Sequence, residues 1–272
     1  MEVVAGVDAG SIFTKAVIIE LNGRVISSSV GRTLGAAEKA GSSCLNEALR
    51  TAGLKAEDIR YIVATGYGRV MVPFANKHLT EITCHAEGAA FLFPDVRTVI
   101  DIGGQDSKVI SINDEAKVKR FIMNDKCAAG TGRFLEVMAD ALGISLEEMS
   151  DLSFQSKNRI EVSSLCTVFA ESEVISLVST GQDIADIAAA IFRSISKRMI
   201  GMIGQVGLIE KVVMTGGVAQ IKGQVHALED ELHTEFVVPE NPQIVGALGA
   251  AILAARELEH GMAGREGARS PR

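Results

Sequence analysis

Short apolar runs, each followed by a turn, open this chain. The first three runs are residues 3–8, 14–21 and 24–30. Asn22-Gly23 lies between the second and third runs, and an Asn-Gly pair in that position is a strong hairpin signal. The pattern predicts three consecutive antiparallel strands, with Gly10 and Ser11 in the first turn.

The same pattern returns about a third of the way along the chain. Its apolar runs are residues 97–101, 107–112 and 116–123. Asp8 and Lys15 are seven positions apart, as are Asp101 and Lys108, and a glycine follows each aspartate by two positions. The sequence therefore predicts an internal duplication of one βββ unit.

Helical periodicity accompanies both copies. Apolar spacing and capping residues predict helices at 42–53, begun by Ser42 or Ser43, and at 85–93, 131–143, 167–180, 183–199 and 242–258. Further strands are predicted at 60–65 and 211–214. The fold class is therefore α/β. Residues 261–272 have too little apolar content to pack, and we expect a disordered tail there.

Size and charge narrow the function. The 272 residues suffice for one large or two medium domains. The net charge of −7 argues against nucleic acid or an anionic membrane as the main partner. The first thirty residues lack a signal-peptide pattern, and no apolar run approaches the roughly 18 residues of a membrane helix. We expect a soluble cytoplasmic protein.

Three glycine turns follow apolar strands and are typical of phosphate sites. They contain Gly10, Gly103 and the pair Gly216-Gly217. Glycine lets a backbone come close to a phosphate and present its N–H groups. Asp8 and Asp101 lie where a carboxylate can hold Mg²⁺ or its waters. Neither a P-loop nor a GxGxxG motif is present, so the predicted nucleotide site belongs to neither class.

The cysteines suggest a second chemistry. Cys44, Cys84, Cys127 and Cys166 lie far apart, without a CxxC pair. Cys127 and Cys166 directly precede predicted helix starts, where unpaired N–H groups favour anions such as a phosphate, a thiolate or its metal cluster. The alternative is that all four are small buried hydrophobic residues.

Six segments together resemble one family. They are VDAGSIFTKAVI, ATGYGR, DIGGQDSKVI, NDKCAAGTGRFLEVMA, CTVFAESEVISLVSTG and VVMTGGVAQ. This set is similar to the activator ATPases of 2-hydroxyacyl-CoA dehydratases such as the 2-hydroxyglutaryl-CoA type, relatives of the benzoyl-CoA reductase ATPase subunits. The resemblance implies an actin-like fold of the Hsp70 and sugar-kinase superfamily, with two ribonuclease-H-like domains built from a duplicated βββαβα unit. The first would span 1–96, completed by the helix 242–258, and the second 97–241.

The resemblance also implies cofactors and partners. It implies a homodimer with one oxygen-sensitive [4Fe–4S] cluster, ligated by Cys127 and Cys166 of each subunit. Reduced ferredoxin or flavodoxin would supply an electron. Binding and hydrolysis of ATP to ADP with Mg²⁺ would then drive that electron to an iron–sulfur 2-hydroxyacyl-CoA dehydratase.

Residue roles carry over position by position. Asp8 and Asp101 would serve Mg²⁺ or its waters, and Asp101 or Gln105 would orient the attacking water. Phosphate-turn residues would be Gly10, Ser11, Thr14 and Lys15, then Gly103, Gly104, Gln105 and Lys108. Residues bordering the adenosine would be Gly216, Gly217, Ala219 and Gln220. Residues near the cluster arm would be Gly130, Gly132 and Arg133.

Other interpretations stay open at this point. The chain fits a small-molecule kinase or an ATP-dependent sensor without a cluster, a benzoyl-CoA reductase ATPase subunit, or an orphan activator of another radical enzyme. Lys15 and Lys108 are alternatively strand-edge charges. The Cys84-His85 pair is better explained as a packed helix start than as a pair of metal ligands. Glu171 and Glu173 are better explained as the charged face of a helix than as catalytic acids.

Overall fold

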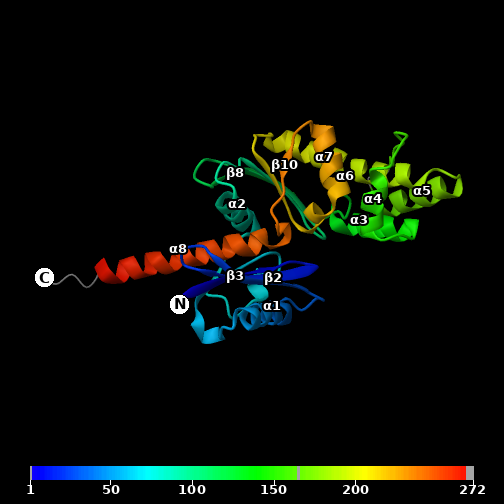
Figure 1. Ribbon diagram of the computed structural model, residues 1–272. Helices are drawn as coiled ribbons and strands as arrows, with labels where there is room; N and C mark the ends of the chain where they lie inside the picture. The colour runs from blue at the N-terminus through cyan, green and yellow to red at the C-terminus, as the bar shows by residue number, and fades with distance from the viewer. Residues whose placement is uncertain (1, 164–165, 268–272) are drawn as a thin grey trace. The chain divides into compact units, whose positions relative to one another are not determined.

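The computed structural model describes residues 2–163 and 166–267. In that part of the chain the strands form two five-stranded sheets, one in each of two compact units. Unit 1 comprises Met1–Pro94 and Ile244–Arg272, and unit 2 comprises Asp95–Gln243 (Figure 1). The second half of the chain thus ends by returning to the first unit.

Unit 1 begins with the three predicted antiparallel strands. Its strands are β1 (Val3–Ala9), β2 (Phe13–Glu20), β3 (Val25–Arg32), β4 (Ile59–Thr65) and β5 (Lys77–His78). Its helices are α1 (Ala37–Ala52), α2 (Glu81–Leu92) and α8 (Val245–Gly267). The 3₁₀ turns η1 (Ala56–Asp58) and η2 (Arg69–Met71) lie within it, and η4 (Pro242–Ile244) lies at its border with unit 2. The sheet order is β3-β2-β1-β4-β5, and β4 and β5 run parallel to β1.

Helices cover both faces of this sheet. Every residue of β1 is buried, so this central strand is apolar throughout rather than alternating. Its odd-numbered side chains join a core with α1, while Val4 joins a second core with α8. Figure 1 shows α1 and α8 on opposite sides of β2 and β3.

Glycines allow α2 and α8 to pack at very short range. A Cβ built on Gly249 would lie 1.8 Å from the Cys84 carbonyl oxygen, and one on Gly88 would lie 2.2 Å from the Val245 carbonyl oxygen. No side chain fits at either distance. The small-residue helix predicted near the end of the chain is therefore small because a second backbone lies against it.

Unit 2 repeats this plan and adds helices. Its strands are β6 (Thr98–Ile102), β7 (Ser107–Ile112), β8 (Val118–Asn124), β9 (Val212–Thr215) and β10 (Phe236–Val237). Its helices are α3 (Gly132–Leu142), α4 (Leu146–Ser153), α5 (Thr167–Ser179), α6 (Ile184–Val206) and α7 (Lys222–Leu232), with the 3₁₀ turn η3 (Gly217–Gln220). Phe134, Met138, Phe192 and Met199 anchor its main core.

The predicted duplication is confirmed by the strand pairing. The second sheet has the order β8-β7-β6-β9-β10, which matches the first sheet strand for strand. Asp8 lies directly opposite Lys15 in the first hairpin, and Asp101 lies directly opposite Lys108 in the second. The seven-residue spacing therefore corresponds to one cross-strand pair that occurs in both units.

Several predicted boundaries were wrong. Helix α1 begins at Ala37, not at Ser42 or Ser43, because Gly41 faces Phe74 and Val7 in the core and tertiary packing extends the helix. Helix α2 begins at Glu81, not at His85, because the Thr80 hydroxyl caps it by accepting from the Thr83 N–H. Helices α4 and α7 were not predicted from the sequence.

The C-terminal helix is longer than predicted. It starts at Val245, after the η4 turn, and continues to Gly267, well past the predicted end at 258. Residues 259–267 therefore extend an existing helix, which costs far less than starting one. The remainder of the predicted disordered tail, 268–272, lies outside the described residues.

Candidate functional site

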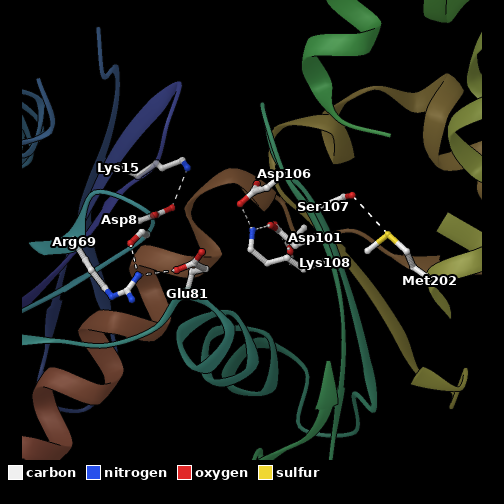
Figure 2. A network of polar contacts seen from close by, with 11 residues as sticks. Asp8, Lys15, Arg69, Glu81, Asp101, Asp106, Ser107, Lys108 and Met202 are labelled. Carbon is white, nitrogen blue, oxygen red and sulfur yellow. Dashed lines mark hydrogen bonds and ion pairs between the residues drawn. The ribbon is translucent and has the colours of Figure 1, made fainter. Parts of the chain in front are cut away.

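The turn between β1 and β2, which the sequence predicts to bind phosphate and which is called the first phosphate turn below, is stabilised by an ion pair. The Lys15 ammonium lies 2.9 Å from Asp8 Oδ2, and both side chains are largely buried (Figure 2). The pair follows from the β1–β2 register, which sets the two residues opposite each other. Lys15 is therefore an internal partner of Asp8 in this turn.

Hydroxyl groups brace the same turn. The Thr14 and Thr33 hydroxyls are 3.0 Å apart, and the Thr33 hydroxyl donates to the Gly10 carbonyl oxygen at 2.7 Å. A Cβ on Gly10 would lie 2.6 Å from the Phe13 carbonyl oxygen, so this position requires glycine. Thr14 is fully buried and shapes the turn, whereas Ser11 is exposed at its tip.

The second turn contains a tighter version of the ion pair. The Lys108 ammonium lies 3.0 Å from Asp101 Oδ2 and 2.7 Å from Asp106 Oδ2, and the lysine side chain is only 4% exposed. Figure 2 shows the ammonium between the two carboxylates. Burial opposes the lysine charge, but the two carboxylates outweigh it and raise the pKa of Lys108. The ammonium is therefore a fixed cation of this turn.

Asp106 and Thr215 were not among the predicted site residues. The Thr215 hydroxyl donates to Asp101 Oδ1 at 2.9 Å, so both oxygens of Asp101 are engaged. Phe13 stands in the first turn where Asp106 stands in the second. An acid two positions before the repeated lysine was the available sequence signal for Asp106.

Backbone hydrogen bonds join the second turn to the segment that carries Cys127. The Gly132 N–H donates to the Gly103 carbonyl oxygen, and the Arg133 N–H donates to the Gly104 carbonyl oxygen, both at 2.8 Å. A Cβ on Gly132 would lie 3.2 Å from that Gly103 oxygen. Two N–H groups at the start of α3, which the sequence suggested as an anion site, are thus used by the phosphate turn itself.

The third glycine turn, Gly216-Gly217, lies against the end of β6. Gly216 has a φ of +88°, and a Cβ there would lie 2.3 Å from the Ile102 carbonyl oxygen. Of the residues predicted to border adenosine, Gly217 is half-buried and Gln220 is exposed, but Ala219 lies in the core of unit 2. Gln105, predicted to orient water, is exposed at the tip of the second turn.

The four cysteines separate into two classes. Cys44 and Cys84 are buried, and burial raises the pKa of both thiols, that of Cys84 to about 12. Cys127 is half-buried, and Cys166 is exposed and is the N-cap residue of α5. Helices α3 and α5 pack against each other in unit 2. Cys127 and Cys166 are thus the accessible thiols, and each precedes one helix of a packed pair.

The remaining candidates have structural surroundings. His85 is buried in α2, and a Cβ on Gly246 would lie 2.9 Å from its Nε2 and 3.4 Å from Asp8 Oδ2. The Glu173 carboxylate accepts from the Ser163 N–H and hydroxyl. In the described part of the chain, groups of three or more His, Cys, Asp or Glu side chains suited to a metal ion are absent.

Comparison with known proteins identifies the family. The model of the BadF/BadG/BcrA/BcrD ATPase family matches residues 5–254. The chain belongs to this ATPase family. The predicted resemblance is thereby confirmed, since three of its relatives carry the names that the motifs suggested.

Relatives in this family cover almost the whole chain. The activator of lactoyl-CoA dehydratase from Anaerotignum propionicum is 48% identical, over 92% of this chain and 96% of that protein. The 2-hydroxyisocaproyl-CoA dehydratase activator from Clostridioides difficile is 45% identical, over 93% of this chain and 95% of that protein. A benzoyl-CoA reductase component from Thauera aromatica is 34% identical, over 93% of each.

Solved structures agree with the fold. Component A of the (R)-2-hydroxyglutaryl-CoA dehydratase from Acidaminococcus fermentans has a TM-score of 0.91 at 44% identity, covering 95% of this chain and 100% of that one. The 2-hydroxyisocaproyl-CoA dehydratase activator from Clostridium difficile, solved with bound ADPNP, also has a TM-score of 0.91, at 43% identity, covering 96% and 97%.

The predicted actin-like α/β fold is confirmed by these structures and by a more distant sugar kinase. A ROK family glucokinase from Streptomyces griseus has a TM-score of 0.56 at 15% identity, covering 93% of this chain and 99% of that one, and it shows the fold alone. Within the described residues, no helix is both long and apolar enough to cross a membrane.

Proposed function

We propose that this chain is the ATP-dependent one-electron activator of an iron–sulfur 2-hydroxyacyl-CoA dehydratase, and that it works as a cytoplasmic homodimer. The observation that carries this proposal is the direct backbone link from Gly103 and Gly104 to the segment that follows Cys127. Such a link suits a protein in which a nucleotide must act on a redox centre. The names of the relatives at 45% and 48% identity support the same function.

The thiols suit a shared [4Fe–4S] cluster. A cluster of this type takes about four thiolates, and one chain offers two accessible thiols, Cys127 and Cys166. A twofold axis would supply the same pair from a second copy. The chemistry that such a cluster supplies is one-electron transfer, here between a reduced ferredoxin or flavodoxin and the dehydratase.

The surface beside Cys166 supports the homodimer. Helix α5 buries only Ala170 and Val174, while Val168 and Phe169 are 66% and 67% exposed. Exposed apolar side chains gathered on one helix are typical of a protein contact. A second copy that brings its own Cys127 and Cys166 would cover this surface.

The phosphate turns supply the ATPase side. Gly10 and Ser11 of the first turn, and Gly103 and Gly104 of the second, would present backbone N–H groups to the phosphates. Asp8 and Asp101 would hold the waters of Mg²⁺, a hard cation that prefers oxygen ligands. The buried lysines orient both carboxylates through direct contacts, and the exposed Gln105 is available to position the attacking water.

Coupling follows from the backbone link. When the Gly103-Gly104 turn adjusts to a nucleotide, the Gly132 and Arg133 N–H groups move with the carbonyl oxygens that they bond. The start of α3 moves with them, and so does the Cys127 turn. Because hydrogen bonds of this kind hold their partners near 2.9 Å, even a small displacement of the turn is transmitted.

The partner distinguishes this function from its nearest alternative. Benzoyl-CoA reductase ATPase subunits share the family but are less similar, with 34% identity for the Thauera aromatica protein against 45% and 48% for the dehydratase activators. We therefore propose a dehydratase as the electron acceptor.

The first test measures metal, assembly and hydrolysis together. The protein is purified without oxygen, and iron, acid-labile sulfide and solution mass are determined beside the rate of ATP hydrolysis. About two irons per chain in a dimer supports one shared cluster. C127S and C166S should abolish iron binding, whereas C44S, at a buried thiol, should not. Iron-free protein after anaerobic reconstitution, or about four irons per chain, would contradict the shared cluster.

A further inference from the structure

A single arginine lies behind the turn that carries Cys127. Arg198 belongs to α6, and its Nη2 is 3.4 Å from Asn124 Oδ1, at the end of β8. The Asn124 amide in turn donates to the carbonyl oxygens of Cys127, at 2.9 Å, and Ala129, at 3.2 Å. The guanidinium is thus connected to the backbone of the Cys127 turn through one amide side chain.

The stem of the arginine contacts the same turn directly. Gly130 has a φ of +88°, and a Cβ built there would lie 2.7 Å from Arg198 Cδ and 3.4 Å from its Nε. Glycine at this position therefore serves two purposes. It permits a backbone conformation that other residues resist, and it leaves room for the arginine side chain beside the turn.

One nitrogen of the Arg198 guanidinium has no hydrogen-bond partner among the described residues. This nitrogen, Nε, is buried. An unpartnered buried donor costs free energy, so a hydrophobic residue of similar size would fill this space at lower cost. The arrangement is understandable if a cation is needed near the loop.

We propose that Arg198 is a positioning residue for Cys127. It fixes the turn from behind, through Asn124 and through its contact with Gly130, and it adds a positive charge behind the turn that carries Cys127, a thiol that we assign to an anionic metal centre. The positioning of the turn by Arg198 depends only on this geometry. The role of the Arg198 charge rests on the proposed cluster function.

The first experiment needs no cluster and uses the apo full-length protein. Alkylation of each cysteine by iodoacetamide is followed by mass spectrometry in wild-type protein, R198M, R198K and N124A. The matched control is K197M, since Lys197 is the next residue on α6 and pairs with Glu161 at the surface. Buried Cys44 and Cys84 report on unfolding, and exposed Cys166 reports on the reagent.

Loss of one hydrogen-bonded connection, worth about 1 kcal/mol, should raise the alkylation rate of Cys127 about fivefold in N124A, which keeps the arginine charge. The rise should be smaller in R198M, because loss of the cation also makes the thiol less reactive. The Cys166 rate should stay constant, and R198K should fall between wild type and R198M. An unchanged Cys127 rate in both R198M and N124A would overturn the proposal. If R198M exposes Cys44 and Cys84, N124A alone decides.

The second experiment measures the reduction potential of the reconstituted protein. Removing a nearby cation makes reduction of an anionic centre harder, so R198M should have a lower potential than wild type, and R198K and K197M should not. A potential unchanged in R198M overturns the role of the charge. If wild-type protein binds no iron, the cluster function fails, whereas the alkylation rates still test the positioning of Cys127.

Discussion

Replacement of Lys108 by methionine tests how much the second phosphate turn depends on its buried cation. The duplication provides a matched control, because Lys15 occupies the same position in the first turn. Lys108 is 4% exposed in its side chain and contacts two carboxylates. Lys15 is 15% exposed and contacts one, at 2.9 Å. The two variants therefore remove the same group from two degrees of burial.

The expected loss of unfolding free energy is larger in K108M than in K15M by a factor of about two or more. K108M removes the buried ammonium that both Asp101 and Asp106 contact, and breaking a buried pair in this way costs about 3–5 kcal/mol. K15M leaves a single, less buried carboxylate, for which we expect about 1–2 kcal/mol, between exposed and fully buried pairs.

Urea denaturation followed by the helical circular dichroism signal measures the difference. K108M should lower the transition midpoint of unit 2 by about 1 M or more, given the usual dependence of unfolding free energy on urea. D101N added to K108M should restore part of the loss, because it neutralises one of the two carboxylates that Lys108 contacts. A loss in K108M no larger than that in K15M would refute the reasoning about burial.

Two further predictions concern packing and pH. G249A should destabilise the protein by about 1–3 kcal/mol or more, since its Cβ would lie 1.8 Å from the Cys84 carbonyl oxygen. G201A, on an open helix face, should stabilise it by about 0.5–1 kcal/mol. A urea midpoint for G249A that is not lower than that for G201A would contradict this packing argument. The Asn158 backbone N–H, followed by its side-chain amide and neighbouring donors, holds the pKa of Asp186 well below its usual range. The stabilisation that the Asp186 carboxylate provides is therefore present above its ordinary pKa of 3.8 and lost as pH falls below it. The difference in unfolding free energy between wild type and D186N should therefore shrink in acid. A constant difference from pH 3 to 7 would contradict the assignment.

The sequence by itself determined the duplication, the family and the types of most elements, though not helices α4 and α7. Apolar runs and turns such as Asn22-Gly23 predicted the hairpin strands. The repeated Asp-to-Lys spacing of seven predicted the duplication, because the register of an antiparallel pair follows from its turn length. Helix α3 was predicted between Thr131 and Gly143, and both residues are its caps. These features depend on local geometry, which a short stretch of residues encodes almost completely.

Tertiary structure decided what local patterns do not contain. Helix α1 extends back to Ala37 because Gly41 faces the core, and Gly249 of α8 is required by the backbone of α2. The bond from Thr215 to Asp101, the bonds from Gly132 and Arg133 to the second phosphate turn, and the contact of Arg198 with the Cys127 turn join residues distant in sequence. Such contacts arise when separate elements pack, so only the folded chain shows how the second phosphate turn and the Cys127 turn are connected.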